Sequence, residues 1–267
     1  MDRFVAVIKT SFKQQFQYRW TFAVSIFTQP ILLLLNLILF KSIYSFNGTD
    51  VIKGYSLEQM VWYFTSFMVV NSFVWNAIAR EISYNIISGD MAIDLLRPMP
   101  YFRVIIAESV ASRIIAQVMD LLPGMVIYSL IIFPYFLTPV SILRFLPVVL
   151  LAAAINHLYS FMLGMTAMSL KNNNSIIWLN DLFIYVAGGA LIPMEFYPGW
   201  LNAILDFLPF KYIIYWPIQF FLNKESTWQA GAYLRILGLQ LFWVIILYIG
   251  SKIMWRTLVK KFCSAGG

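Results

Sequence analysis

Long uncharged runs alternate with short charged segments along most of the chain. Six runs stand out: 20–40, 59–79, 114–137 with Asp120 inside it, 145–170, 182–194 and 236–251. A helix needs about 20 mostly apolar residues to cross a bilayer, and about 17 can suffice. The fifth run reaches this length if it begins near Ser175 and includes Asp181, and the sixth does so if Arg235 and Lys252 reach opposite membrane surfaces. The pattern predicts an all-α integral membrane protein with six transmembrane helices.

The composition agrees with a lipid environment. Hydrophobic residues make up 61% of the chain and charged residues 12%, whereas soluble domains carry about 25% charged residues. The net charge of +7 is explained by attraction to anionic lipids of the inner leaflet, so no nucleic-acid partner is needed.

The first 19 residues predict an interfacial helix rather than a cleaved signal peptide. They carry basic residues and have no continuous apolar core. Phe4, Ile8, Phe12 and Phe16 recur at every fourth position and form one apolar stripe, which suits a helix lying on the membrane surface. An ordinary extension before the first span is the alternative.

The basic residues predict the orientation. If both termini are cytosolic, 13 of the 19 Lys and Arg residues lie inside and the other six lie outside, as the positive-inside rule expects. Residues 200–222 do not form a seventh span in this interpretation, because Pro209 and Pro217 interrupt the stretch and Asp206 and Lys211 place charge in its middle.

The chain is thus expected to form a single transmembrane domain. Its expected parts are an interfacial helix (1–19), spans one and two (20–79), a cytosolic segment (80–113), spans three to five (114–192), outer re-entrant helices (193–224), span six (233–255) and a cytosolic tail (256–267). The cytosolic segment is unusually polar, since it holds eight of the chain's 31 charged residues. A solvated inner loop is the simple explanation, and a docking site for a soluble partner is the functional one.

Two acidic residues and the only histidine fall inside predicted spans. Asp120 and Asp181 lie at similar depth in the inner leaflet and would share a hydrated site, unless Asp120 simply pairs with Arg113. His157 lies near the middle of the fourth run, where a neutral imidazole bonded to a neighbouring helix is the structural alternative.

The second run also carries a polar stripe. Asn71, Trp75 and Asn76 lie on neighbouring helical positions, and such groups need hydrogen-bond partners inside the protein. They are expected to face the bundle, where they either line a translocation path or hold helices together.

The sequence has no pattern of common enzyme chemistry. It lacks a phosphate-binding GxxxxGK[ST] loop, an HExxH motif and a GxSxG motif, and its single cysteine is Cys263. No catalytic residue and no metal site is expected. If ATP drives this protein, a partner must bind the nucleotide and its Mg²⁺.

Several short motifs in order resemble the bacterial type 2 ABC exporter permeases, a six-span family with a separate ATPase. The resemblance rests on Glu81-Ile82, residues 88–98, Pro100-Tyr101, residues 188–193, residues 196–201, residues 208–212 and residues 264–267. It implies a cytosolic N-terminal connecting helix, a coupling helix between spans two and three, and re-entrant helices between spans five and six. It also implies two ATPase subunits and a second permease subunit, identical or homologous.

The predicted coupling helix lies between Gly89 and Pro98, which bracket a short segment. Its apolar members are expected to fill a groove on the partner, and its charged members are expected to fix the register. The apolar set is Met91, Leu95 and Leu96, and the charged set is Asp90, Asp94 and Arg97.

These features together predict an exporter permease of the bacterial cytoplasmic membrane that moves an amphipathic or hydrophobic cargo. The second hypothesis is a proton-coupled transporter that uses Asp120, Asp181 and His157 as a relay. A membrane enzyme acting on lipid-linked substrates ranks third, because the loops offer only scattered acids.

Overall fold

The computed structural model describes residues 19–96, 100–117, 121–170 and 173–265. These residues are mostly helical, and their only sheet is a two-stranded antiparallel hairpin. The all-α fold predicted from the hydrophobic runs is therefore confirmed. The predicted interfacial helix lies outside the described residues apart from Arg19, and so do Arg97 and Asp120.

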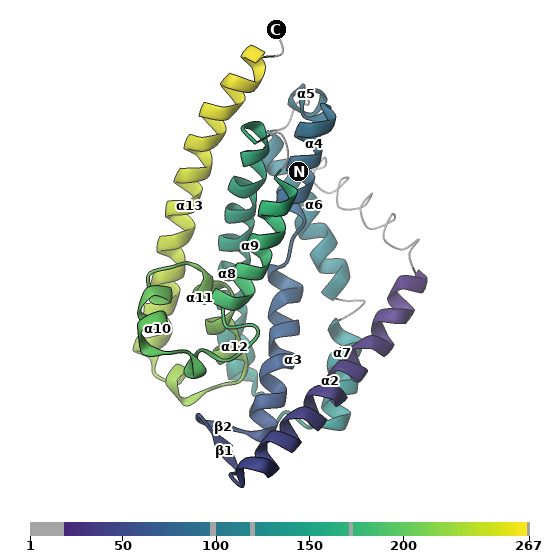
Figure 1. Cartoon of the computed structure of the whole chain (residues 1–267), viewed down its shortest axis with the longest axis vertical. Coiled ribbons are helices and arrows are strands. Elements are labelled where there is room, and N and C mark those ends of the chain that lie inside the picture. The colour runs from purple at the N-terminus through teal and green to yellow at the C-terminus, as the bar shows by residue number, and fades with distance from the viewer. Residues whose placement is uncertain (1–18, 97–99, 118–120, 171–172, 266–267) are drawn as a thin grey trace.

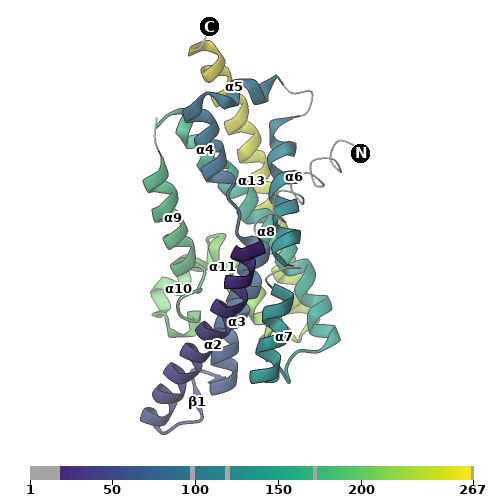
Figure 2. The same ribbon diagram turned by 90° about the vertical axis from the view of Figure 1, so that its right-hand side faces the viewer.

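Four long helices set the length of the molecule (Figure 1). They are α2, Arg19–Asn47, α3, Leu57–Val74, α8, Pro139–Met165, and α13, Ala230–Ala265. The 36 residues of α13 extend over about 54 Å at about 1.5 Å per residue. The C-terminal end of α13 lies at the same end of the molecule as α5, Asp90–Leu95, and opposite the β1–β2 hairpin (Figure 1, Figure 2).

The second predicted run, 59–79, contains most of α3 and only the first two residues of α4, and the rest of α4 lies in the predicted cytosolic segment. α3 ends at Val74, residues 75–77 are not helical, and α4 covers Ile78–Ser88. After α5 the chain returns through α6, Tyr101–Ala116, and α7, Leu122–Ile131. The segment 80–113 is therefore largely helical in the part of the chain that the structure describes.

The fifth predicted run ends earlier than expected. A short 3₁₀ turn, η2 (Thr166–Met168), follows α8, and α9 covers Asn174–Ala187. Gly188 N donates to Ile184 O at 2.8 Å, and Gly189 then takes a φ of +75° that ends the helix. The uncharged run to Met194 thus extends past the end of α9, because these glycines turn the chain and hydropathy does not register a turn.

Residues 193–224 fold into short helices. They comprise η3 (Met194–Phe196), α10 (Gly199–Asp206), α11 (Phe210–Ile213) and α12 (Tyr215–Phe221), and η4 (Glu225–Thr227) follows. The longest has eight residues, or about 12 Å, against a hydrocarbon core of about 30 Å. None of these helices is long enough to cross a bilayer.

Local signals explain where the outer elements begin. β1, Val51–Ile52, pairs with β2, Tyr55–Ser56, through a two-residue turn in which Lys53 and Gly54 both have positive φ. Ser56 then caps α3 in a reciprocal pair of hydrogen bonds with Gln59. The backbone N–H groups of Ser56 and Gln59 therefore both have hydrogen-bond partners where the hairpin passes into α3.

Buried apolar side chains form two clusters. The larger one joins α3, α8, α12 and the part of the bundle near the β1–β2 hairpin. It includes Trp62, Tyr63 and Phe220. The smaller one lies between α4, α5, α6 and the end of α8, and it includes Ile82, Met91 and Phe161. The segment from α4 to α6 thus has a core of its own.

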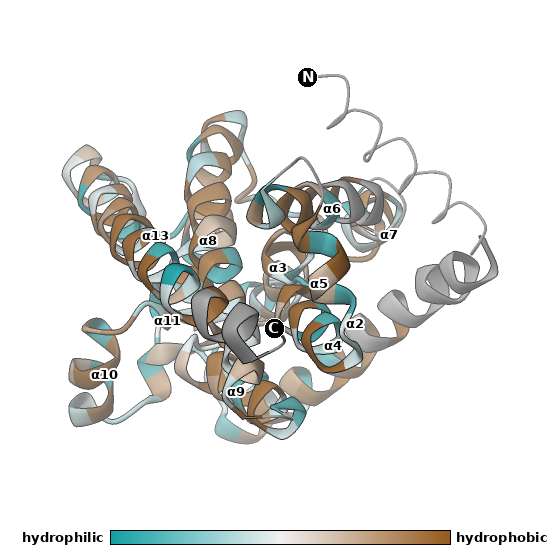
Figure 3. Ribbon diagram, turned by 90° about the horizontal axis from the view of Figure 1, so that it is seen from above, coloured by the Kyte–Doolittle hydropathy of each residue, from teal (hydrophilic) through white to brown (hydrophobic). Residues whose placement is uncertain are grey.

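Large apolar side chains also cover the outer faces of the long helices. Examples on α2, α8 and α13 are Ile38, Leu143, Leu150, Leu234 and Ile245. Hydrophobic residues dominate α8 and α13 in the view from above (Figure 3). Surface of this extent is unusual for a protein in water and suits contact with lipid.

Two helices among the described residues have the length and composition to cross a membrane. They are Pro139–Met168 and Ala230–Val259, and Leu122–Ile131 is a shorter apolar helix. Other predicted spans are divided or short, since the second is split into α3 and α4 and α9 has 14 residues. The six-span arrangement stays a prediction.

Packing of α4 on α8 generates a first test. A Cβ at Gly164 would lie 2.9 Å from both Ala79 O and Ile82 Cβ, so Gly164→Ala should lower the free energy of unfolding by about 1–3 kcal/mol. Gly238→Ala is the control, because a Cβ at this α13 position meets nothing within 4 Å. Chemical unfolding in detergent would measure both variants. Equal stability of the two would show that α4 and α8 are not in close contact.

Candidate functional site

A short helix, α5, lies where the coupling helix was predicted. Gly89 has a φ of +87° and serves both as the C-cap of α4 and as the N-cap of α5, a conformation that residues with a Cβ seldom adopt. Asp90 is exposed and accepts a hydrogen bond from Ser88 Oγ at 2.7 Å. The chain therefore turns sharply at Gly89, and α5 leaves the axis of α4.

The apolar residues of α5 do not all face outward. Met91 is fully buried in the smaller core cluster, and Leu95 packs against that cluster. Leu96 is 86% exposed and Ile93 is 64% exposed. The side chains left for a partner are thus Ile93 and Leu96, and Ile93 was not among the predicted residues. Arg97 lies outside the described residues.

A polar cavity of about 300 Å³ lies between α4, α5 and α6. Four carboxylic acids line it: Glu81 from α4, Asp90 and Asp94 from α5, and Glu108 from α6. Asn85 donates to Asp94 Oδ2 at 3.2 Å and to Tyr101 Oη at 3.2 Å. Asp94 thus lies within this chain's own polar network, and the cavity was not predicted.

Burial and charge both act on Glu81. Burial is the largest cause that raises the pKa of Glu81, and the nearby acids Glu108 and Asp94 raise it further, to about 7. Glu81 therefore keeps its proton to a higher pH than an ordinary glutamate does.

The break between α3 and α4 gathers the polar stripe of the second span. Asn156 of α8 donates to Val74 O at 2.9 Å, and Asn76 donates to the same carbonyl at 3.3 Å. Asn76 Oδ1 also accepts from Ile78 N at 3.2 Å, at the start of α4. These bonds satisfy backbone groups that the missing helical turn leaves free.

Side chains on both sides of the break join it to neighbouring helices. The guanidinium carbon of Arg113 in α6 lies 4.6 Å from the centre of the Trp75 ring, in the range of a cation–π contact. The backbone next to Trp75 is held by α8, because Asn156 bonds Val74 O. Trp75 and Asn76 of the predicted stripe therefore lie where the break meets α6 and α8.

The only histidine bridges α6 and α8. His157 Nδ1 lies 2.6 Å from Ala153 O in its own helix, and Nε2 lies 2.9 Å from Ser109 Oγ. Both ring nitrogens have partners in a buried position. This arrangement suits the structural role that was the alternative for His157.

Asp181 pairs with a residue that sequence reasoning did not connect to it. The carboxylate of Asp181 in α9 forms an ion pair with Arg80 at the start of α4, and both side chains are partly exposed. Asp120 lies outside the described residues, so a site shared by Asp120 and Asp181 stays a prediction.

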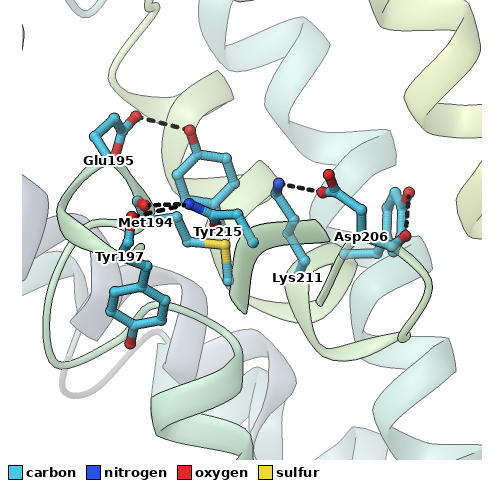
Figure 4. A network of polar contacts seen from close by, with 8 residues as sticks. Met194, Glu195, Tyr197, Asp206, Lys211 and Tyr215 are labelled. Atoms are coloured by element: carbon cyan, nitrogen blue, oxygen red, sulfur yellow. Dashed lines mark hydrogen bonds and ion pairs between the residues drawn. The ribbon is translucent and has the colours of Figure 1, made fainter. Parts of the chain in front are cut away.

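A second polar network lies near the β1–β2 hairpin, and Figure 4 shows its contact between Glu195 and Tyr215. Glu195 Oε1 accepts hydrogen bonds from Tyr215 at 2.7 Å and from Tyr55 at 3.0 Å. Lys224 lies 3.6 Å from the centre of the Tyr55 ring and donates to Gly54 O at 2.8 Å. The hairpin is thereby fastened to the short helices of residues 193–224. Only spatial contacts reveal the network, because its members are far apart in sequence.

The bond that Asn156 donates at the helix break can be tested. Asn156→Leu keeps the approximate shape but removes the donor to Val74 O, so the free energy of unfolding should fall by about 1–3 kcal/mol. Asn47→Leu, at the exposed end of α2, should change it by less than about 0.5 kcal/mol. Thermal unfolding in detergent would compare the two. A loss for Asn156→Leu no larger than the control's would contradict the proposed role of this bond.

One family model matches this chain. The model, described as ABC-2 family transporter protein, covers residues 31–266. That range includes the described part of every element above except the start of α2. A search of curated proteins gave no significant match. The chain belongs to the ABC-2 family of transporter proteins.

Proposed function

We propose that this chain is the membrane-spanning permease subunit of an ATP-driven exporter. The observation that carries this proposal is the family match over residues 31–266. ATP and Mg²⁺ bind to a separate ATPase in this proposal, with two copies in the working assembly. The likeness to a transporter family also favours a role in transport over an enzymatic one.

Six spans would be built from α2, α3, the end of α6 with α7, α8, α9 and α13, while α4, α5 and most of α6 would form the cytosolic segment 80–113. This assignment places α5 and the end of α13 on one side of the membrane and the β1–β2 hairpin on the other (Figure 1). The positive-inside rule makes the side of α5 and both termini cytosolic. A bacterial cytoplasmic membrane is the location that this arrangement fits.

The docking surface proposed for the ATPase is the exposed part of α5. Ile93 and Leu96 project from a short helix that Gly89 directs away from α4. Asp90 supplies a charge at its start. Two exposed apolar side chains beside a carboxylate suit a partner groove with an apolar floor and a basic rim.

A second permease subunit, identical or homologous, is proposed to cover the face of α9. Trp178, Leu182 and Phe183 are exposed there, next to the partly exposed ion pair of Arg80 and Asp181. An ion pair is costly in contact with hydrocarbon. Shelter by another subunit or by a hydrated path between the subunits removes this cost.

Transport would follow from movement at the two ends of the bundle. The ATPase pushes on α5, the helix pair α3 and α4 transmits the movement past the break, and the network around Glu195 opens at the outer end. Each state must contact the partner differently for ATP to drive the change. The cargo that fits the apolar, aromatic-rich bundle is amphipathic or hydrophobic.

The docking surface makes a direct prediction. Ile93→Ser combined with Leu96→Ser should abolish co-purification of the ATPase, because the exposed apolar contacts are lost. The double variant should also abolish transport. Tyr135→Ser, which changes an exposed residue far from α5 along the chain, should leave both intact. Met91→Ser should instead lower stability, because Met91 is buried. Normal ATPase retention by the double variant would remove α5 as the docking site.

The proton-coupled hypothesis is less favoured because His157 and Asp181 already have structural partners. Asp181→Arg and Arg80→Asp should each impair transport, and the double variant should recover it, because the ion pair is rebuilt with reversed polarity. A proton relay through Asp181 would instead stay inactive in the double variant. Asp50→Asn, at an exposed residue near the hairpin, is the control for altered charge in a transport assay.

A further inference from the structure

A small hollow lies between α3 and α7, apart from the polar cavity described above. Its volume is about 60 Å³, and its walls come from these two helices and from the residue before α7. Thr65, Val69 and Tyr128 form a buried floor, whereas Met68 and Met125 are partly exposed and form a rim. The hollow therefore opens toward the surface of the bundle.

Gly124 borders the hollow on the side of α7. This glycine is buried, yet a Cβ at its position would meet none of the described residues within 4 Å. Buried backbone is normally enclosed by close neighbours, as Gly164 is by Ala79 and Ile82. The space beside Gly124 is therefore not filled by any side chain that the structure describes.

The polar groups around the hollow have partners inside the protein. Thr65 Oγ1 and Ser72 Oγ donate to backbone carbonyls of their own helix at 3.3 Å and 2.7 Å. Tyr128 Oη donates to Met68 Sδ at 3.6 Å, which joins α7 to α3. A buried water needs two to four polar partners, so a lining whose hydroxyl groups are already bonded suits an apolar occupant better than water.

The surface of α7 beside the hollow is apolar and exposed. Leu122, Val126 and Leu130 recur at every fourth position and form one stripe. Met125, on the rim of the hollow, is three positions from Leu122 and therefore its neighbour on the helix surface. In the span assignment proposed above this stripe faces lipid, so the hydrocarbon of the bilayer is the material next to the opening.

The size of the hollow favours a slender group over the face of another protein. An α-helix with its side chains is about 10 Å across, whereas a space of about 60 Å³ takes the end of a flexible chain. If the space stayed empty, the atoms of the floor would lose dispersion contacts on one side. A hydrocarbon chain restores these contacts without needing a hydrogen bond.

We propose that the hollow between α3 and α7 binds the end of a hydrocarbon chain of a bilayer lipid, which packs against Gly124 between Met68 and Met125. The chain then completes the packing of the second span on the third. This proposal rests on the spans proposed above for α3 and α7, and it needs neither an ATPase nor a cargo.

Photolabelling of the purified full-length chain in lipid nanodiscs tests the proposal. The nanodiscs would contain phosphatidylcholine and a small share of phosphatidylcholine with a diazirine at the end of one acyl chain. After irradiation, mass spectrometry of peptides would measure the label on each residue. Met68 and Met125 should carry about fivefold more label than Val126, because a chain that prefers the hollow to bulk lipid stays near its walls.

Two glycine variants give different expected results. Gly124→Leu places a side chain in the hollow, so label on Met68 should fall to the level of Val126, and label on Val126 should not change. Gly238→Leu is the matched control, because this α13 position also leaves a Cβ without a described neighbour within 4 Å and does not line the hollow. Its label should match that of the wild type.

A measurement on the wild type covers the case in which Gly124→Leu fails to fold. With ¹³C-labelled methionine methyl groups, Met68 and Met125 should show nuclear Overhauser effects to the acyl chain protons of the lipid. Effects to water instead, or to a second copy of the chain in a mixed-label sample, would identify another occupant and overturn the proposal.

The labels also separate this proposal from the span assignment. Label on Val126 with no excess on Met68 and Met125 would overturn the hollow as a chain site while keeping α7 in the membrane. Absence of label from all three residues would show that α7 does not face lipid, and both proposals would fail. Label on Met68 that stays high in folded Gly124→Leu would reject the hollow alone.

Discussion

The fold depends on satisfying the backbone groups at the break between α3 and α4. Inside a bilayer no water is available to an unpaired carbonyl, so a missing helical turn survives only where side chains replace its hydrogen bonds. Asn156 supplies such a bond from α8 to Val74 O, while Arg113 of α6 covers Trp75. These contacts let the chain change direction within the bundle, and they place α4, α5 and the polar cavity beyond it.

α8 lies at the centre of this arrangement. It contacts α3, α4, α12 and α13 and gives the bundle its common core. On the side of α4 that faces α5 and α6, the polar cavity lies beside an apolar cluster that includes Ile82 and Met91. At the opposite end, hydrogen bonds of Glu195 join the hairpin to the short helices.

The sequence predicted the helical fold, the position of α5 and the absence of a span in residues 193–224, because apolar runs, Gly89 and the prolines act locally. It did not predict the break at residues 75–77, since no proline or glycine marks it. Nor did it predict that Asp181 pairs with Arg80, which lies in a distant part of the chain. An amphipathic pattern also cannot tell whether Met91 faces its own core or a partner, and the structure places it in its own core.

The exposure of Leu96 bears on how the cell must handle this protein. A side chain that is 86% exposed favours aggregation and proteolytic removal when it faces water. If α5 docks an ATPase as proposed, a chain made in excess of that ATPase would keep this side chain exposed, whereas an assembled one would cover it. Balanced synthesis of the two subunits, for example from adjacent reading frames, would then be a requirement of protein quality control as well as of transport.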